Sequence, residues 1–382
     1  MTNVDLSVEI AGIKLRNPII LSSGPMSKDG ESIKKAAENG AGAVVTKTIS
    51  FEAAKVARPC IIKVPKHGIS PPVVINAEEW SDLTLEDWLE REMKIAKTAG
   101  VPIIGSIWVP EKDIHRVGEL AQMVVDAGAV MIEIPGYDPE EVIQLVSEAK
   151  KKVDVPVIAK IAMKNFEVEP YIKAIHKAKA DAISAIDTMG PVLKIDINTG
   201  KPYLGGAKGG GIAGAGRISG QAINPFAVYW IARARQLTDL PLLGIGGITR
   251  AEDVVEMLMV GATAVQIHTS VILFGYKIFS RLAKGLEKFL TEKGYSSVKD
   301  IIGYAQQYLD TTKHEIPIRY GGIVSEIDKN KCTGCTLCVQ VCPWSAIHME
   351  GKIAVSDPKK CYGCGLCTSV CPVDAISLIE TK

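Results

Sequence analysis

The chain has 382 residues, enough for two or three domains, and its 47% hydrophobic and 23% charged residues are typical of a globular protein. Its 44 Lys and Arg residues balance 43 Asp and Glu residues, which gives no basis for nucleic acid or an anionic membrane as a partner. No apolar run approaches the roughly 20 residues of a membrane-spanning helix, and the first twelve residues lack the pattern of a signal peptide. All cysteines except Cys60 lie after residue 330, which favours metal ligation in a reducing compartment over a disulfide framework. We therefore predict a cytoplasmic protein.

Short β-branched runs alternate with helical patterns over the first 270 residues. Each run is almost uninterrupted apolar sequence, as expected for parallel strands buried on both faces. The count of eight and the length of the region predict a TIM (β/α)8 barrel within residues 1–310, and the count weighs against a doubly wound open sheet. The predicted strands span residues 18–23, 43–47, 102–108, 129–134, 156–161, 182–186, 241–246 and 263–268, and helical patterns span 112–127, 138–152, 168–179, 224–238 and 250–260.

Two connections between the predicted strands, residues 48–101 and 187–240, are longer than ordinary loops, so we expect them to help build the functional site. After the barrel, residues 311–325 are predicted to be a linker. Residues 326–382 form two similar halves, each with one cysteine run, and are predicted to fold as a small ferredoxin-like α+β domain.

The two cysteine runs, "CTGCTLCVQVCP" and "CYGCGLCTSVCP", have the C-x2-C-x2-C-x3-C-P spacing of bacterial two-cluster ferredoxins. In that arrangement the fourth cysteine of each run ligates the other cluster. A pair of zinc sites is the alternative, but zinc needs only two CxxC pairs and leaves the other cysteines unexplained. The spacing therefore predicts two 4Fe–4S clusters, one held by Cys332, Cys335, Cys338 and Cys371, the other by Cys361, Cys364, Cys367 and Cys342.

Polar residues stand where the predicted barrel strands end, which is the face that carries function in this fold. A lysine inside the apolar run "VIAKIAM", Lys160, is costly to bury unless it meets an anionic or electron-rich partner. An ion pair with Glu133 or Asp187 is the alternative that needs no ligand. The other strand ends carry Ser22, Ser23, Gly24, Lys47, Thr48, Ser106, Thr188, Gly246, Gly247, His268 and Thr269.

The ends of the last two strands, "GIGGITRAED" and "QIHTSV", offer glycine N–H groups and a helix start, which suit a phosphate. Turn glycines without a ligand are the alternative. One-electron clusters beside a phosphate-binding barrel call for a cofactor that converts single electrons into pairs, and FMN does this. The run "GGGIAG" follows no strand and opens no helix, so it is not a dinucleotide site. Because no nicotinamide or FAD module is visible, we expect the electron donor or acceptor to be a separate protein, such as a ferredoxin or an NAD(P)H/FAD subunit in a homo- or hetero-oligomer.

Residues 6 to about 303 resemble the FMN-dependent dihydroorotate dehydrogenases and the pyrimidine-reducing part of the dihydropyrimidine dehydrogenases, which also carry a C-terminal two-cluster ferredoxin segment. The motifs that carry the resemblance are "NPIILSSGP", "TKTIS", "VPVIAKI", "GRISGQAINP", "GIGGI" and "QIHTSV", in family order.

The resemblance implies roles for individual residues. Lys160 would stabilise negative charge on the reduced flavin, and Asn76 would hydrogen-bond the substrate. For His268 only a backbone role is implied, because the family usually has a small residue there. The remaining flavin contacts implied are Ser22, Ser23, Gly24, Lys47 and Thr48 around the ring, and Ser219, Gly220, Gly246, Gly247 and Thr269 around the ribityl chain and phosphate.

The chain departs from the family at the substrate end. Glu133 and Asp187 stand where the family has asparagines, and Gly136 stands where it has a mobile cysteine or serine that moves a proton. An ionised carboxylate only accepts hydrogen bonds, so we expect a substrate rich in N–H or O–H donors or a cationic one, rather than uracil, thymine or orotate. Thr188 is a further candidate contact. The proton source would be Glu133, Asp187, Tyr137 or Cys60, with Glu133 favoured because two carboxylates in one enclosed site favour protonation of one of them.

We therefore predict an oxidoreductase that acts on a CH–CH group. It would move electrons between 4Fe–4S clusters, FMN and a small cyclic or unsaturated substrate. The alternative is an electron-relay or scaffold subunit whose barrel has lost its chemistry.

Overall fold

The computed structural model describes residues 4–65, 72–163, 167–205, 208–209, 211–309 and 321–381. The chain divides by its contacts into two compact units, Met1–Asp310 and Thr311–Lys382. Most of the predicted linker, 311–325, lies outside the described residues. Among the helices of the described ranges, none has the length and apolar character needed to span a bilayer.

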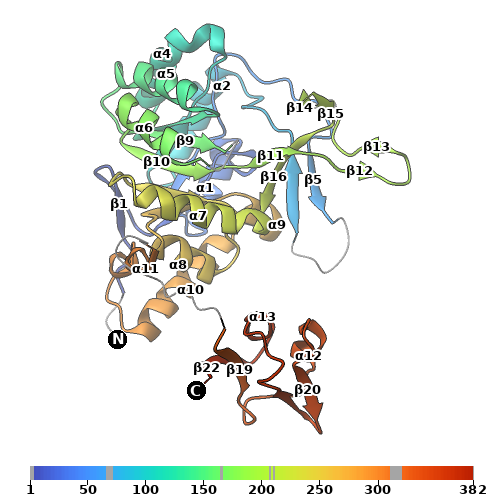
Figure 1. The fold of residues 1–382 in the computed structure, drawn as a ribbon. Coiled ribbons are helices and arrows are strands. Elements are labelled where there is room, and N and C mark those ends of the chain that lie inside the picture. Colours follow the sequence, from blue (N-terminus) through green and yellow to red (C-terminus); the bar gives the residue numbers. More distant parts are fainter. Residues whose placement is uncertain are drawn as a thin grey trace. The chain divides into compact units, whose positions relative to one another are not determined.

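The first unit is a closed barrel of eight parallel strands (Figure 1). Strand neighbours follow the chain order around the ring, and the last strand pairs with the first through Ile20 and Gln266. The TIM barrel is therefore confirmed, and all eight predicted strands are present. They are β3 (Ile19–Leu21), β4 (Ala43–Val45), β7 (Ile103–Ser106), β8 (Met131–Gly136), β9 (Val157–Ala162), β10 (Ala182–Ile186), β17 (Leu242–Ile245) and β18 (Ala264–Ile267).

Helices surround the barrel, and their ends follow local sequence signals. At the start of α5 the Asp138 carboxylate accepts a hydrogen bond from the Glu141 N–H, and Pro139 takes the first helical position. Gly294, in the left-handed conformation, ends α10. The helical elements are α1 (Gly30–Glu38), α2 (Leu85–Asp87), η2 (Trp88–Glu92), α3 (Met93–Lys97), η3 (Glu111–Arg116), α4 (Val117–Asp126), α5 (Pro139–Lys150), α6 (Glu169–Ala178), α7 (Asn224–Arg235), α8 (Ala251–Met259), α9 (Thr269–Phe274), α10 (Ile278–Lys293) and α11 (Gln306–Leu309), with short turns η1 (Pro25–Ser27), η4 (Gln221–Ile223) and η5 (Val298–Ile301).

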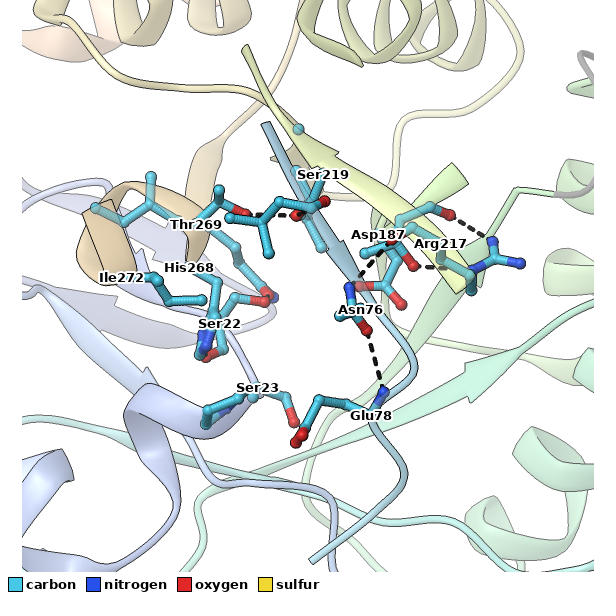
Figure 2. A pocket seen from close by; sticks show the side chains of 18 of the residues that line it. Ser22, Ser23, Asn76, Glu78, Asp187, Arg217, Ser219, His268, Thr269 and Ile272 are labelled. Carbon is cyan, nitrogen blue, oxygen red and sulfur yellow. Dashed lines mark hydrogen bonds between the residues drawn. The ribbon is translucent and has the colours of Figure 1, made fainter. Parts of the chain in front are cut away.

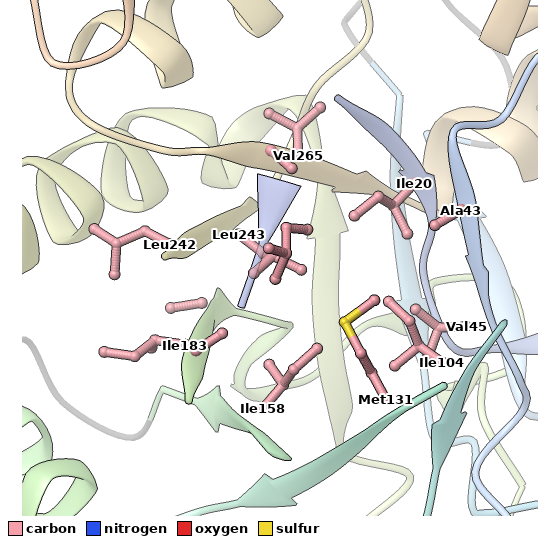
Figure 3. Close-up of a cluster of buried hydrophobic side chains, with 14 of the residues drawn as sticks. Ile20, Ala43, Val45, Ile104, Met131, Ile158, Ile183, Leu242, Leu243 and Val265 are labelled. Atoms are coloured by element: carbon pink, nitrogen blue, oxygen red, sulfur yellow. The ribbon is translucent and has the colours of Figure 1, made fainter. Parts of the chain in front are cut away.

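Every barrel strand contributes buried aliphatic side chains to the core (Figure 3). Ile20, Ile104, Ile158 and Val265 are fully inaccessible to solvent. Such continuous burial accounts for the uninterrupted apolar runs, because strands covered on both faces have no polar side to alternate with. The packed interior leaves the carboxyl ends of the strands as the place for polar residues.

The two long connections meet in a four-stranded antiparallel sheet, in the order β11-β16-β6-β5. Its central pair joins segments far apart in sequence, with Asn76 opposite Arg217. Both strands of this pair contribute side chains to the cavity described below. The sheet comprises β5 (Ile61–Val64), β6 (Val73–Asn76), β11 (Met189–Val192) and β16 (Gly216–Gly220), and smaller hairpins are β1–β2 (Val8–Ile10, Ile13–Leu15), β12–β13 (Ile195–Asp196, Lys201–Pro202) and β14–β15 (Lys208–Gly209, Ile212–Ala213).

The second unit repeats one pattern twice, offset by 29 positions, the separation of Cys332 and Cys361. Each cysteine run leads into a short helix, α12 (Leu337–Val341) or α13 (Leu366–Ser369). Two antiparallel pairs complete the unit, β19 (Ile323–Ile327) with β22 (Ile376–Glu380), and β20 (Ile347–Glu350) with β21 (Ile353–Ser356). This is the predicted ferredoxin-like fold.

Candidate active site and cysteine sites

A cavity of about 240 Å³ opens at the carboxyl ends of the barrel strands (Figure 2). Its wall combines residues that end or follow barrel strands with residues of β6 and β16. Every residue predicted to contact flavin or substrate lines it, with the exception of Glu133. These residues are Ser22, Ser23, Gly24, Lys47, Thr48, Asn76, Tyr137, Lys160, Asp187, Thr188, Ser219, Gly220, Gly246, Gly247, His268 and Thr269.

Lys160, on β9, is the buried cation of this cavity. Its ammonium lies 3.2 Å from Glu133 Oε1 and 3.6 Å from Asp187 Oδ1. Burial by itself would lower the pKa of Lys160, but the Asp187 and Glu133 carboxylates outweigh it, so the pKa is raised and the side chain remains an ammonium. The cavity therefore contains a fixed positive charge.

Glu133 lies below the cavity and is fully buried. Its Oε2 accepts hydrogen bonds from Gln266 Nε2 at 2.6 Å and from Ser184 Oγ at 2.8 Å, and Ser22 Oγ donates in turn to the Gln266 side-chain oxygen at 2.8 Å. Because these neighbours and Lys160 enclose it, the carboxylate does not reach the space that a substrate would enter. The structure thus places Glu133 beside Lys160 and outside the cavity lining, and its predicted roles as proton carrier and substrate contact stay predictions.

Asp187 faces the cavity, unlike Glu133. It follows β10 with a φ of 54°, a left-handed conformation that Asp adopts more readily than most residues. Its side chain is 30% exposed, so one carboxylate can pair with Lys160 and still meet a ligand.

One end of the cavity is built from backbone. Gly220, Gly246 and Gly247 all have positive φ, and a Cβ on Gly247 would lie 2.7 Å from the Asn224 Cβ. Asn224 fixes this turn by donating to the Gly246 carbonyl at 2.9 Å. The turn therefore needs glycine for its conformation and for space, and it leaves a cradle free of side chains, which suits a phosphate.

His268 ties the end of β18 to the turn after β3. The Met26 N–H donates to His268 Nε2 at 3.2 Å, so Nδ1 carries the proton and donates to the Ser22 carbonyl at 2.9 Å. Burial lowers the pKa of His268 to about 4, with nearby Lys47 and Lys160 acting in the same direction. The ring is thus a neutral cross-link between two loops that line the cavity.

The opposite end of the cavity carries a carboxylate that the sequence analysis missed. Glu78 Oε2 lies 2.9 Å from Lys47 Nζ, and Cys60 Sγ donates to Glu78 Oε1 at 2.9 Å. Burial raises the pKa of Glu78, but Lys47 and the Cys60 hydrogen bond outweigh it, so the net pKa is lowered. Burial and the Glu78 charge raise the pKa of Cys60 to about 11, which keeps this thiol protonated. Glu78 follows Asn76 by two residues in "VVINAEEW", so the signal was present in a motif already noted.

Tyr137 lies just beyond β8 and lines the cavity with 37% of its surface exposed. Arg217, a second residue that the sequence analysis missed, lies over its ring at 5.6 Å and donates to the Thr188 hydroxyl at 2.9 Å. Burial, together with the Asp187 charge, raises the pKa of Tyr137, so the phenol keeps its proton at neutral pH. It can therefore act as a proton donor.

Gly136 precedes Tyr137 at the position where the family has a cysteine or serine. It is buried, and a Cβ there would lie 2.6 Å from Val142 Cγ2. The neighbouring helix α5 therefore fills the space that a side chain would need. Trp80 and Trp108 form another wall of the cavity, with ring centroids 4.7 Å apart.

In the second unit, two cavities are each lined by four cysteines. One cavity has Cys332, Cys335, Cys338 and Cys371, and the other has Cys342, Cys361, Cys364 and Cys367. Within the described residues, no three Cys, His, Asp or Glu side chains are close enough to hold a single metal ion. Each cavity thus gathers three cysteines of one run and the fourth cysteine of the other run.

Comparisons with known proteins agree with this architecture. The family model for dihydroorotate dehydrogenase matches residues 5–290, and the model for the 4Fe-4S dicluster domain matches residues 325–378. The catalytic subunit of dihydroorotate dehydrogenase B (NAD(+)) from Pyrococcus furiosus is 36% identical over 316 residues, covering 80% of this chain and 100% of that protein. The corresponding subunit from Thermoplasma acidophilum is 33% identical over 319 residues, covering 79% and 99%.

A further relative shares more of the chain. The NAD-dependent dihydropyrimidine dehydrogenase subunit PreA of Escherichia coli is 31% identical over 362 residues, covering 90% of this chain and 86% of that protein. Together with the barrel, its polar cavity and the cysteine-lined unit, these matches mean that the chain belongs to the dihydroorotate dehydrogenase family, a family of flavin-dependent oxidoreductases that act on CH–CH groups, and carries a 4Fe–4S dicluster domain.

Proposed function

We propose that the chain is the catalytic subunit of an FMN-dependent iron–sulfur oxidoreductase with a substrate other than the usual pyrimidines. The observation that carries the proposal is one cavity with a glycine cradle at one end and the fixed ammonium of Lys160 between two carboxylates. The cradle suits the single phosphate of FMN, and the ammonium suits the negative charge of a reduced flavin. When bound, FMN would exchange single electrons with the clusters and a hydride with the substrate.

We assign the flavin contacts to the cavity residues predicted from the family resemblance. Gly246 and Gly247 would offer backbone N–H groups to the phosphate, while Ser219 and Thr269, whose hydroxyls lie 2.8 Å apart, would meet the ribityl chain. Lys160 would sit at the electron-rich edge of the ring system, held in place by Glu133 from below.

We assign one 4Fe–4S cluster to Cys332, Cys335, Cys338 and Cys371, and the other to Cys361, Cys364, Cys367 and Cys342. The crossed pairing predicted from the spacing is supported by the fourth cysteine of each run, which lines the cavity of the other run. Each cluster would carry one electron, so the two together would match the electron pair that a CH–CH bond gains or loses.

The substrate end favours a ligand that donates hydrogen bonds. Asp187 and Glu78 both line the cavity, and ionised carboxylates only accept. A ring that presented carbonyl oxygens to them would bring its partly negative oxygens against negative carboxylates. We therefore exclude uracil, thymine and orotate as substrates. Trp80 and Trp108 offer aromatic surface to a planar cyclic substrate. We propose an unsaturated cyclic compound with N–H or O–H donors, or a cationic one.

Tyr137 is the proton donor that the geometry favours. In the reductive direction, one carbon of the C=C bond receives a hydride and the other receives a proton, so the site needs one acid within reach. Tyr137 lines the cavity and keeps its phenolic proton. Glu133 lies beneath Lys160, outside the cavity lining. Cys60 also lies outside the lining, and its thiol already donates to Glu78. Tyr137 also follows the missing family cysteine directly.

We further propose a cytoplasmic location, because eight cysteine ligands need a reducing compartment. A separate electron-transfer protein would supply or remove the electrons. Relatives described as catalytic subunits support this expectation.

The test is anaerobic purification with flavin and iron analysis, followed by reduction of the flavin and a screen of unsaturated cyclic compounds. We expect FMN, two four-iron clusters per chain, and flavin reoxidation by a compound rich in hydrogen-bond donors. Clusters without FMN would overturn the proposal. Asp187→Asn adds a matched test, because restoring an amide should increase turnover of uracil relative to the wild-type chain.

The second candidate is an electron-relay subunit, and the packing of Gly136 against Val142 favours it, since the usual proton carrier has no space. A relay would bind FMN and accept electrons, but no small molecule would reoxidise its flavin. The same screen therefore separates the two functions.

A further inference from the structure

The two cysteine-lined cavities of the second unit differ at equivalent positions. With the offset of 29, Ser325 corresponds to Ala354, and Ser356 corresponds to Ile327. Both cavities share their cysteine frame: each has four cysteines, and Cys338 and Cys367 occupy equivalent buried positions. The repeat thus places two hydroxyls beside one cavity and only hydrocarbon at the matching places of the other.

The two hydroxyls form a chain that ends on a cysteine sulfur. Ser325 Oγ lies 3.5 Å from Cys361 Sγ and 2.7 Å from Ser356 Oγ, and the Ser325 N–H donates to the same sulfur at 3.3 Å. A cluster-bound thiolate can only accept, so the Ser325 hydroxyl donates to Cys361 and must accept from Ser356. Ser325 is only 5% exposed, so water does not compete for this bond.

We propose that Ser325, oriented by Ser356, raises the reduction potential of the cluster held by Cys342, Cys361, Cys364 and Cys367, and makes the two clusters of the repeat inequivalent. This rests on the proposed assignment of two clusters. Reduction adds one electron to a cluster and no proton, and the added charge is shared by its sulfurs. A hydroxyl that donates to a sulfur stabilises that charge, and a chain of hydroxyls strengthens the bond.

Ala354 makes the complementary variant possible. It is 2% exposed, lies on β21 and lines the cavity of Cys332 at the position equivalent to Ser325. A serine there adds one oxygen at the same place in the repeat, without a second serine behind it, because Ile327 occupies that position. Ala354→Ser should therefore raise the potential of the other cluster, by less than Ser325 raises its own.

The cavity near Ser325 is also covered by Trp344 and Tyr362, whose rings stack at 4.5 Å and 7°. This cover also affects the potential, because it limits access of water to the cluster. It is present equally in the wild-type chain and in Ser325→Ala, so a comparison of the two isolates the hydroxyl.

The test is an anaerobic redox titration of the holoprotein followed by electron paramagnetic resonance, with iron analysis on the same samples. Ser325→Ala should lower the reduction equilibrium constant of one cluster several-fold, where tenfold corresponds to about 59 mV for one electron. Ser356→Ala should lower the equilibrium constant of the same cluster by a smaller factor. Ala354→Ser should raise the equilibrium constant of the other cluster. Ser377→Ala, on the exposed part of β22, is the control and should change neither.

The outcomes separate the two proposals. Iron content below two four-iron clusters in the wild-type chain would overturn the cluster assignment. Two intact clusters whose potentials are unmoved by Ser325→Ala, or Ser325→Ala and Ala354→Ser shifting the same cluster, would overturn the role of Ser325 alone.

Discussion

One end of the barrel cavity is formed by backbone, and the opposite end is formed by side chains. The cradle of Gly220, Gly246 and Gly247 is backbone held in conformations that exclude side chains, while the opposite end depends on the side chains of Tyr137 and Glu78. Few residue types can form a backbone cradle of this shape. The motifs at this end accordingly match those of the family that the chain resembles. Side chains at the other end can be exchanged without altering the fold, and there the chain departs from its family. The comparison teaches that cofactor and substrate specificity can change independently here.

Both ends of the cavity depend on Lys160. Replacing it should therefore have the largest effect on turnover, flavin content and stability. In Lys160→Met we expect turnover to fall by about a thousandfold, flavin content to drop, and the barrel to lose about 3–5 kcal/mol, because Glu133 is left buried without its cation. Flavin absorbance, steady-state rates and denaturant unfolding would measure these effects.

The control for Lys160 removes the orphaned charge as well. The double variant Lys160→Met with Glu133→Gln should recover much of the stability without recovering turnover. If the single variant keeps both flavin and rate, the assigned contact with the cofactor is wrong.

Tyr137→Phe tests the substrate end alone. Turnover should fall by about a hundredfold while FMN stays bound, because only a proton donor is lost. Since burial and Asp187 raise the pKa of Tyr137, the wild-type rate should decline only above the usual range of a tyrosine, and the variant should lack that alkaline limb. Tyr229→Phe, an exposed tyrosine on α7, is the matched control. A normal rate in Tyr137→Phe would transfer the role to Asp187.

Gly247→Ala tests the cofactor end alone. The new Cβ would meet Asn224, so FMN affinity should fall about tenfold, whereas the rate at saturating FMN should change little. Gly12→Ala is the control, since Gly12 also has a positive φ of 88° but no atom lies near its Cβ position. Both variants carry a backbone strain of about 1–2 kcal/mol, and only the first should lose flavin. Fluorescence titration of the apoprotein with FMN distinguishes them.

Replacing His268 should have the smallest effect of these variants. The effect should be seen mainly in how the stability of the folded chain depends on pH. Its folded pKa of about 4 lies below its unfolded value, so the unfolded chain binds more protons between about pH 6.5 and 4. Stability from the neutral ring is therefore complete above pH 6.5 and is lost as the pH falls towards 4. His268→Asn keeps the donor to the Ser22 carbonyl and should flatten this part of the profile of melting temperature against pH. An equally steep profile in the variant would contradict the assignment.

The barrel could be predicted from sequence because each strand is an apolar run of its own. The sheet of β5, β6, β11 and β16 could not, since its central pair joins Asn76 to Arg217 across 141 positions and has no local signal. Arg217 stands in the motif "GRISGQAINP", but only this pairing shows that it lines the cavity.

Glu133 was predicted to face the substrate, and the structure buries it beside Lys160. Residues 133, 135 and 137 point to one side of β8, and Pro135 and Tyr137 line the cavity. Glu133 lies two residues before Pro135, which is about 7 Å along the strand at roughly 3.3 Å per residue. Strand periodicity gives the side on which a residue lies, but the depth at which the packed interior ends depends on side chains from all eight strands.

The close packing of Gly136 against Val142 also limits how the chain could be engineered or could have evolved. Gly136→Cys alone would force the new side chain into α5, so restoring the family's proton carrier would need a second change, such as Val142→Ala, in the same step. A chain that passes through either change alone bears a clash or a void. Gly136 and Val142 are therefore coupled positions, so a side chain that moves a proton could be placed at 136 only if position 142 changed with it.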